Sequence, residues 1–161
     1  MASFLAETRT LWFFFAATLV ITCLFPLVGS HWQLTLLDGI SSPAEARSVL
    51  EELTPHQKKI HAWITATLDV AYPIVYGGLF AGSALRVFTR YGRFLALPAL
   101  VVIPTDLIEG VVQVLALTGT ADWLDAKAVL TPAKLVLFAA GLCITVFAWA
   151  TWLYRRTTAS S

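Results

Sequence analysis

Four long apolar stretches dominate this chain and restrict what it can fold into. A helix of about 20 apolar residues spans the hydrocarbon core of a bilayer, so each stretch is typical of a transmembrane helix. Of the 161 residues, 58% are hydrophobic and 13% are charged, whereas a soluble domain usually carries about a quarter charged residues. The sequence therefore predicts a single membrane domain over residues 1–161, folded as an all-α, antiparallel bundle. Its four expected transmembrane helices cover residues 11–29, 63–88, 94–117 and 132–154.

The connection between the first two spans contains a second kind of helix. The motif Ser42-Pro-Ala-Glu45 has an N-cap serine, a proline at the first helical position and a glutamate that closes a capping box. Apolar residues then recur with helical spacing beside charged ones, which predicts a short amphipathic helix over residues 43–53 on the membrane interface or over the bundle. The motif Thr54-Pro-His-Gln57 repeats the capping pattern and starts the next helix.

Basic residues are distributed unequally between the two sides of the expected bundle. Six arginines share the side of the two termini, whereas the other side holds Arg47, Lys58, Lys59 and Lys127 among six acidic residues. Basic residues are enriched on the cytoplasmic side of membrane proteins. We therefore expect a multi-pass membrane protein with both termini cytoplasmic and the amphipathic helix extracytoplasmic.

Polar residues share one face of the third span. Asp106, Glu109 and Gln113 are three and four residues apart, a spacing that places them on the same side of a helix. At 1.5 Å per residue, Glu109 lies about 14 Å and Asp106 about 18 Å from the outer end. The neighbouring antiparallel span carries Tyr72 and Tyr76 at about these depths. Carboxyl and phenol groups are thus expected to meet in the outer half of the bundle.

Two further ionisable residues are expected near this cluster. Asp69 lies about 9 Å below the outer interface on the second span. Lys134 falls in the first turn of the fourth span, where it pairs with Asp69 or Glu109, or instead extends to the outer headgroups. The predicted ligand- or proton-binding site consists of Asp69, Tyr72, Tyr76, Asp106, Glu109, Gln113 and Lys134.

Charge inside a bilayer makes these residues functional candidates. Ionisable side chains within membrane spans are costly and usually mark ligand or proton sites, although hydrogen bonding that only holds the helices in register is the alternative. Asp106 and Glu109 are like charges one turn apart in a poor dielectric, so we expect at least one to be protonated near neutrality. A protonated carboxyl group can donate a hydrogen bond or a proton, which makes these two the candidate catalytic acids.

Three functions fit this pattern. The first is a membrane protein that binds or passes protons or a small lipophilic or cationic ligand, transport then requiring a homodimer. The second is an isomerase-like membrane enzyme that uses one carboxyl as acid and the other as base. The third is an accessory subunit whose acids meet a basic residue of a partner membrane protein. No metal-ligand spacing is evident, so no metal or cofactor is expected, and the net charge of +1 without a basic patch argues against nucleic acid.

Several short motifs resemble those of a known group of proteins. They are Asp69-x-x-x-Pro73-x-x-Tyr76, Asp106-x-x-Glu109, Thr131-x-x-Lys134 and the segment from Pro43 to Leu50. Together they resemble a group of small, uncharacterised bacterial four-span membrane proteins. This resemblance implies a fold and a location in the bacterial inner membrane, and it implies no activity. Many of those proteins have Asn after the Glu, where this chain has Gly110. The layout is also faintly similar to the EXPERA proteins, which include sterol isomerases and the sigma-2 receptor, but no residue roles transfer.

Overall fold

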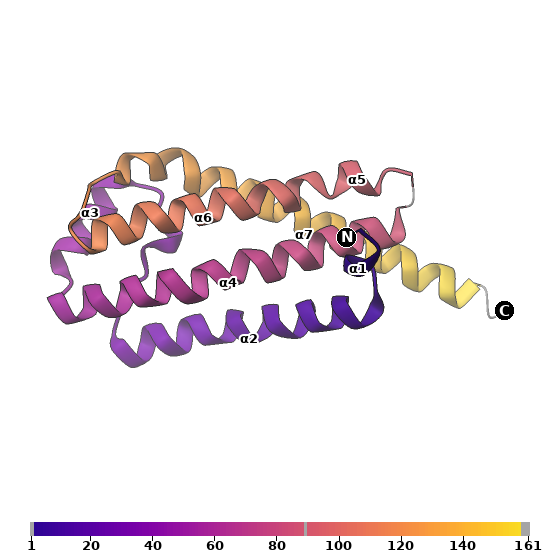
Figure 1. The fold of residues 1–161 in the computed structure, drawn as a ribbon, viewed down its shortest axis with the longest axis horizontal. Coiled ribbons are helices and arrows are strands. Elements are labelled where there is room, and N and C mark those ends of the chain that lie inside the picture. Colours follow the sequence, from indigo (N-terminus) through magenta and orange to yellow (C-terminus); the bar gives the residue numbers. More distant parts are fainter. Residues whose placement is uncertain (1, 89, 159–161) are drawn as a thin grey trace.

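The structure is a computed structural model that describes residues 2–88 and 90–158, and all regular elements in these residues are helical. Four helical segments are long and apolar enough to cross a membrane. The long helices are α2 (Thr8–Trp32), α4 (Pro55–Val87), α6 (Leu97–Leu117) and α7 (Lys127–Thr158). The short elements are α1 (Ala2–Leu5), η1 (Leu37–Gly39), α3 (Pro43–Glu52), α5 (Gly92–Leu95) and η2 (Leu124–Ala126). Figure 1 shows the long helices running along the molecule, with α3 at the end opposite the C-terminal end of α7.

Helix α4 lies at the centre of the bundle, where it packs against α2, α6 and α7. Its glycines permit close approach: a Cβ atom on Gly77 would lie 2.6 Å from Ile103 of α6. A Cβ atom on Gly78 would lie 2.8 Å from the Phe14 ring of α2. These glycines are therefore used inside the bundle, as small residues commonly are between membrane helices.

The helix starts in the polar connections follow the capping motifs. Ser42 accepts a hydrogen bond from the backbone N–H of Glu45, and Thr54 and Gln57 form a complete capping box at the start of α4. Helices α2 and α7 extend beyond the expected spans at both ends and α4 begins eight residues earlier, because they continue into flanking polar residues, whereas α6 lies within its expected span. Pro98 lies in the first turn of α6. A backbone N–H at this position would have no hydrogen-bond partner within the helix, so proline is tolerated there.

The start of the fourth long helix differs from the prediction. The sequence predicts a cap at Thr131 and Pro132, whereas α7 begins at Lys127, directly after η2. Pro132 thus lies inside the helix, and removes one backbone hydrogen bond there. The buried side chains of Leu124 and Lys127 anchor this first turn against the bundle. The earlier start places Lys127 on the same helical face as Thr131 and Lys134.

The hydrophobic core beneath α3 ties the connections to the bundle. Leu37 of η1, Ala46 of α3 and Leu124 of η2 are almost completely buried, and they pack in one cluster with Ile64 of α4 and Val112 of α6. Because these residues come from five different elements, the two connections form a cover over this end of the four long helices.

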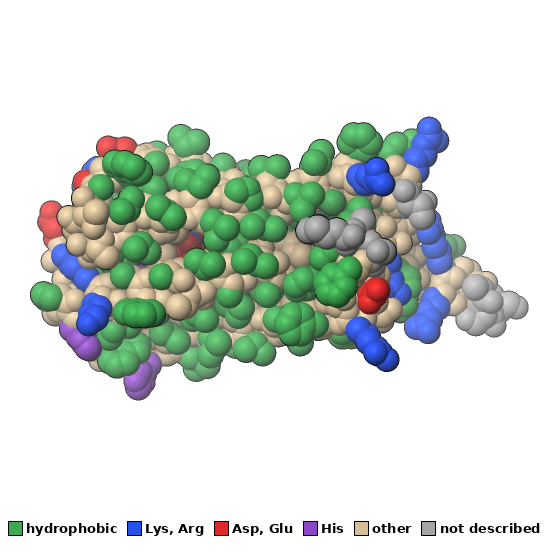
Figure 2. Space-filling model, in the orientation of Figure 1, with side chains coloured by type: hydrophobic (Ala, Val, Ile, Leu, Met, Phe, Trp, Pro, Cys, Tyr) green, Lys and Arg blue, Asp and Glu red, His purple; other side chains and the backbone are tan. Residues whose placement is uncertain are grey.

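The two ends of the bundle differ in charge. Figure 2 shows hydrophobic side chains along the visible face, basic side chains gathered at the end nearest the C terminus, and acidic and histidine side chains mostly at the α3 end. The arginines at the end nearest the C terminus are Arg9, Arg86, Arg90, Arg93, Arg155 and Arg156. An apolar surface between two polar ends has the form of a protein that crosses a bilayer.

Candidate functional site: a buried carboxylate–lysine cluster

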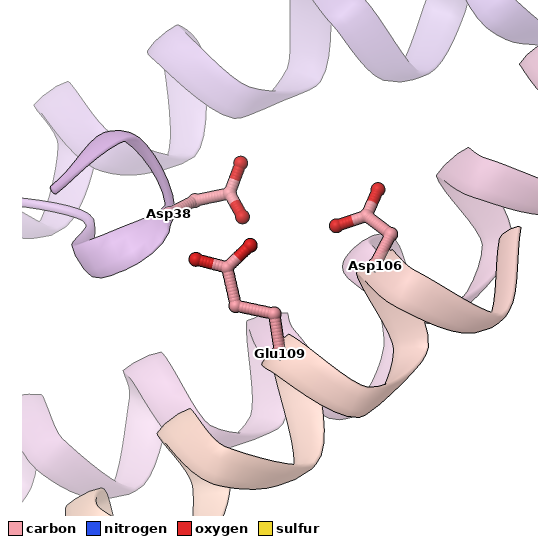
Figure 3. A group of neighbouring side chains, drawn as sticks. All are labelled: Asp38, Asp106 and Glu109. Carbon is pink, nitrogen blue, oxygen red and sulfur yellow. The ribbon is translucent and has the colours of Figure 1, made fainter. Parts of the chain in front are cut away.

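Lys134 lies among three carboxylates near the α3 end of the bundle. Its Nζ atom is 3.0 Å from Oδ1 of Asp106 and 2.7 Å from Oε2 of Glu109, and it also forms an ion pair with Asp38 of η1. Figure 3 shows the three acidic side chains directed toward one another from η1 and α6. One ammonium group therefore links three helical segments.

Glu109 has a second cationic partner. The Lys127 ammonium donates a hydrogen bond to its Oε1 atom, and the Thr131 hydroxyl donates to the same atom at 2.5 Å. Glu109, Lys127 and Thr131 are completely buried. The positions of Lys127, Thr131 and Lys134 are four and three residues apart, so one face of α7 supplies all three donors. We call Asp38, Asp106, Glu109, Lys127 and Lys134 the carboxylate–lysine cluster.

Tyr76 connects this cluster to the aromatic core. Its hydroxyl donates a hydrogen bond of 2.8 Å to Oδ2 of Asp106, and its ring packs at 5.0 Å, centroid to centroid, against both Tyr72 and Phe138. The Tyr72 hydroxyl lies instead 3.0 Å from the Thr22 hydroxyl of α2. Of the two tyrosines in the predicted site, Tyr76 therefore contacts a carboxylate of the cluster directly. Tyr72 reaches the cluster only through its contact with the Tyr76 ring.

Asp69 and Gln113 lie outside the network of ion pairs. Asp69 is half-buried in a groove between α4 and α6, and it forms no ion pair with any residue in the described ranges. Gln113 is fully buried, and neither of its amide atoms has a hydrogen-bond partner within the described part of the chain. The structure thus brings together Tyr76, Asp106, Glu109 and Lys134 from the predicted site.

The position of Lys134 corrects one element of the sequence-based argument. Since α7 begins at Lys127, Lys134 lies in its third turn rather than its first, beyond the range in which a helix N-terminus disfavours a cation. Of the two predicted partners, Lys134 pairs with Glu109 and not with Asp69. Its side chain is only 8% exposed, so it does not extend to the headgroup level.

Two members of the cluster are missing from the sequence-based site. Asp38 lies in a short connection without periodicity, and only the folding back of η1 brings it to Lys134. Lys127 stands in a polar stretch that the sequence assigns to a loop. The helical spacing of Lys127, Thr131 and Lys134 identifies Lys127 as a member of the site if the helix starts five residues earlier than expected.

An exposed ion pair holds the cover in place. Arg47 of α3 donates two hydrogen bonds to Asp122, at 2.8 and 3.2 Å, and one of 3.1 Å to Asp125 of η2. The Arg47 guanidinium group lowers the pKa of Asp122 below its usual value, because it stabilises the charged carboxylate. Beneath this pair, Nε2 of His61 accepts a hydrogen bond from the backbone N–H of Leu37.

The three carboxylates of the cluster have the spacing of metal ligands, but the Lys134 ammonium group lies among them. One oxygen from each of Asp38, Asp106 and Glu109 lies within 4.8 Å of the other two, a spacing that suits a metal ion. The Lys134 ammonium contacts all three carboxylates and supplies the positive charge that a metal would provide.

No protein-family model, curated protein or solved structure matches this chain. Function is therefore inferred from the geometry of the cluster and its charges.

Proposed function

We propose that this chain is a multi-pass membrane protein whose carboxylate–lysine cluster binds one positive charge, either a proton or a small cation. In this proposal the arginine-rich end is cytoplasmic, in accordance with the distribution of basic residues across membranes. The chain then lies in a bacterial inner membrane with both termini inside the cell. The cluster lies in the outer half of the bundle, beneath the cover made by α3 and the two short helices.

The charge of the cluster is the observation that carries the proposal. In their ionised forms, three carboxylates and two ammonium groups leave one negative charge uncompensated. An unpaired charge in a buried site is costly, since the low dielectric neither screens nor solvates it. Binding one proton or one monovalent cation brings the net charge of the cluster to zero.

The exposure of the three acids provides a route to the site. The Asp38 side chain is 43% exposed, that of Asp106 is 11% exposed and that of Glu109 is inaccessible. Asp38 is therefore the member of the cluster at which a cation arrives from the α3 end. Lys134 contacts all three acids, so a change of charge at Asp38 alters the electrostatic environment of both buried carboxylates.

The contacts favour this function over an accessory subunit. That alternative depends on acidic and glycine-rich surfaces that meet a partner helix within the membrane. Asp106 instead faces the interior, where Tyr76 and Lys134 bind it, and Gly77 and Gly78 pack against side chains of the same chain. The enzyme alternative stays a prediction, because it requires a substrate beside Asp106 or Glu109.

Infrared difference spectroscopy of the reconstituted protein tests the proposal. The absorption of a carboxyl group moves when it gains a proton, and Asp106→Asn, Glu109→Gln and Asp38→Asn identify which group responds. In one arm the buffer over the membranes is acidified, and in the other methylammonium is added at constant pH. A proton site gives a new protonated-carboxyl band only in the first arm, whereas a cation site shifts the carboxylate bands in the second.

The matched control is Glu51→Gln, which removes an exposed acid of α3. Its difference spectrum should keep the bands assigned to the cluster. If neither arm changes a band that depends on Asp38, Asp106 or Glu109, the cluster only holds the helices together and the proposed function is wrong.

A further inference from the structure

A groove on the side of the bundle has properties that the carboxylate–lysine cluster does not explain. It lies between α4 and α6 and has a volume of about 300 Å³. Its lining residues are apolar except for Thr65 and Asp69. The apolar lining residues are Ala66, Val70, Leu107, Gly110, Val111, Val114 and Leu115.

The groove opens on the surface that would face lipid. Val70 and Val111, which line it, are 42% and 57% exposed, and Ile108 beside it on α6 is 54% exposed. Gly110 keeps the groove open, because it has no side chain to fill the space. A Cβ atom there would meet only Cγ2 of Thr65, at 3.6 Å.

Asp69 is unusual among the acids of the long helices. Asp106 and Glu109 have ammonium partners, whereas Asp69 has no ion pair with any side chain in residues 2–88 and 90–158. Thr65, one helical turn earlier, is the other polar residue of the lining. Acidic residues within membrane spans usually face the bundle interior and pair with a cation, since a bare carboxylate in hydrocarbon is costly. A cation supplied from outside the chain would complete the site.

We propose that this groove binds an amphiphilic cation from the bilayer, with its protonated amine on Asp69 and its apolar chain between α4 and α6. The protonated amine of the ligand is complementary in charge to Asp69, because Asp69 is the one charged residue in the lining. The lipid-facing opening and the apolar walls suit an apolar chain, and burial of that chain against Val111 and Val114 adds affinity. The lining of the groove contains no member of the carboxylate–lysine cluster, so the variants that test the groove differ from those that test the proposed function.

Equilibrium binding of radiolabelled dodecylamine to the protein in lipid nanodiscs tests this inference, with dodecanol as the uncharged probe. We expect saturable binding of the amine and much weaker binding of the alcohol. Asp69→Asn should weaken amine binding about tenfold or more, since it removes a charge-assisted hydrogen bond from a poorly hydrated site. Glu51→Gln, which neutralises an exposed acid of α3, is the matched charge control and should bind the amine like the original chain.

A second variant tests the groove without changing any charge. Gly110→Leu fills the space beside Thr65 and should abolish binding of the amine, whereas Val129→Leu enlarges an exposed residue of α7 and should leave binding unchanged. Equal binding of amine and alcohol, or undiminished amine binding by Asp69→Asn, would overturn the inference. So would the absence of amine binding together with a cross-link from position 69 to a basic residue of another polypeptide, because Asp69 would then pair with a partner helix.

Discussion

The ammonium group of Lys127 and the carboxylate of Glu109 form an ion pair in which neither side chain is exposed. The pair joins the start of α7 to the middle of α6, and Thr131 donates a further hydrogen bond to the same carboxylate oxygen. Removing both charges from such a pair is often tolerated, whereas removing one leaves the other unpaired in a poor dielectric. Much of the packing of α7 on the bundle therefore depends on matched charges.

We expect Lys127→Met to lower the free energy of unfolding by about 3–5 kcal/mol, because Glu109 loses a buried cationic partner. The double variant Lys127→Met/Glu109→Gln should recover a large part of this loss. Reversible unfolding in mixed micelles, followed by circular dichroism, measures both changes. Val129→Met, on the exposed face of the same helix, is the control. A double variant less stable than the single one would contradict the pairing.

The hydrogen bond from Tyr76 to Asp106 should contribute measurably to stability. We expect Tyr76→Phe to lower the free energy of unfolding by about 1.5–3 kcal/mol, because the hydroxyl donates to a buried carboxylate. The matched change Tyr72→Phe removes a bond to the exposed Thr22 hydroxyl and should cost about 0.5–1.5 kcal/mol. The same unfolding assay applies, and a larger effect for Tyr72→Phe would show that the Asp106 contact is unimportant.

Asp38 should hold η1 against the bundle through Lys134. We expect Asp38→Asn to speed hydrogen exchange in residues 34–42, since the ion pair to α7 is lost, while α4 and α6 keep their protection. Hydrogen exchange with mass spectrometry measures this peptide by peptide. Exchange in residues 34–42 that matches the original chain would mean that the buried Leu37 alone anchors this segment.

The ion pair of Arg47 with Asp122 should make α3 sensitive to acid. Because the pKa of Asp122 is lowered in the folded protein, the pair stabilises the cover above the usual carboxyl value of 3.8. This contribution is lost as the pH falls below 3.8 and through the lowered pKa. We expect hydrogen exchange in α3 to rise over that interval, and Arg47→Gln to show the faster exchange at neutral pH as well. An α3 segment with the same protection in both proteins at neutral pH would contradict this role.

Close packing at Gly82 should place α1 and α2 against α4. A Cβ atom at this position would clash with the backbone carbonyl of Leu5 and lie 2.8 Å from Cδ2 of Leu11. We expect Gly82→Ala to lower the free energy of unfolding by about 1–3 kcal/mol, since one of the backbones has to move. Gly39→Ala, where no atom lies within 4 Å of the added carbon, is the control and should have little effect.

The sequence carries most of the information about the fold because bilayer thickness fixes the length of the apolar runs. The caps at Ser42 and Thr54 are equally local, since each depends on four consecutive residues. The start of α7 could not be predicted from a local sequence pattern. Its first turn lies in a polar stretch and is held by burial of Leu124 and Lys127 against the rest of the bundle, which a local pattern does not report.

The candidate site could be predicted in part. Helical spacing places Asp106 and Glu109 on one face, and similar depth places Tyr76 beside Asp106. Asp38 could not be found, because its contact with Lys134 spans 96 residues and depends on how η1 folds back. Depth in the membrane alone did not predict the surroundings of Asp69. This residue lies at a depth similar to that of the cluster, but it faces a groove at the surface of the bundle.

The most direct test of the central claim is solid-state nuclear magnetic resonance of the protein in bilayers, with ¹⁵N at the lysine Nζ atoms and ¹³C at the Asp and Glu carboxyl carbons. The chain has four lysines: Lys58, Lys59, Lys127 and Lys134. We predict strong nitrogen–carbon dipolar coupling for two ammonium signals, which disappear in Lys127→Met and Lys134→Met respectively. Lys58 and Lys59 form no ion pair with any carboxylate in residues 2–88 and 90–158, so they serve as built-in controls. Four mobile ammonium signals without such coupling would show that no buried carboxylate–lysine cluster exists.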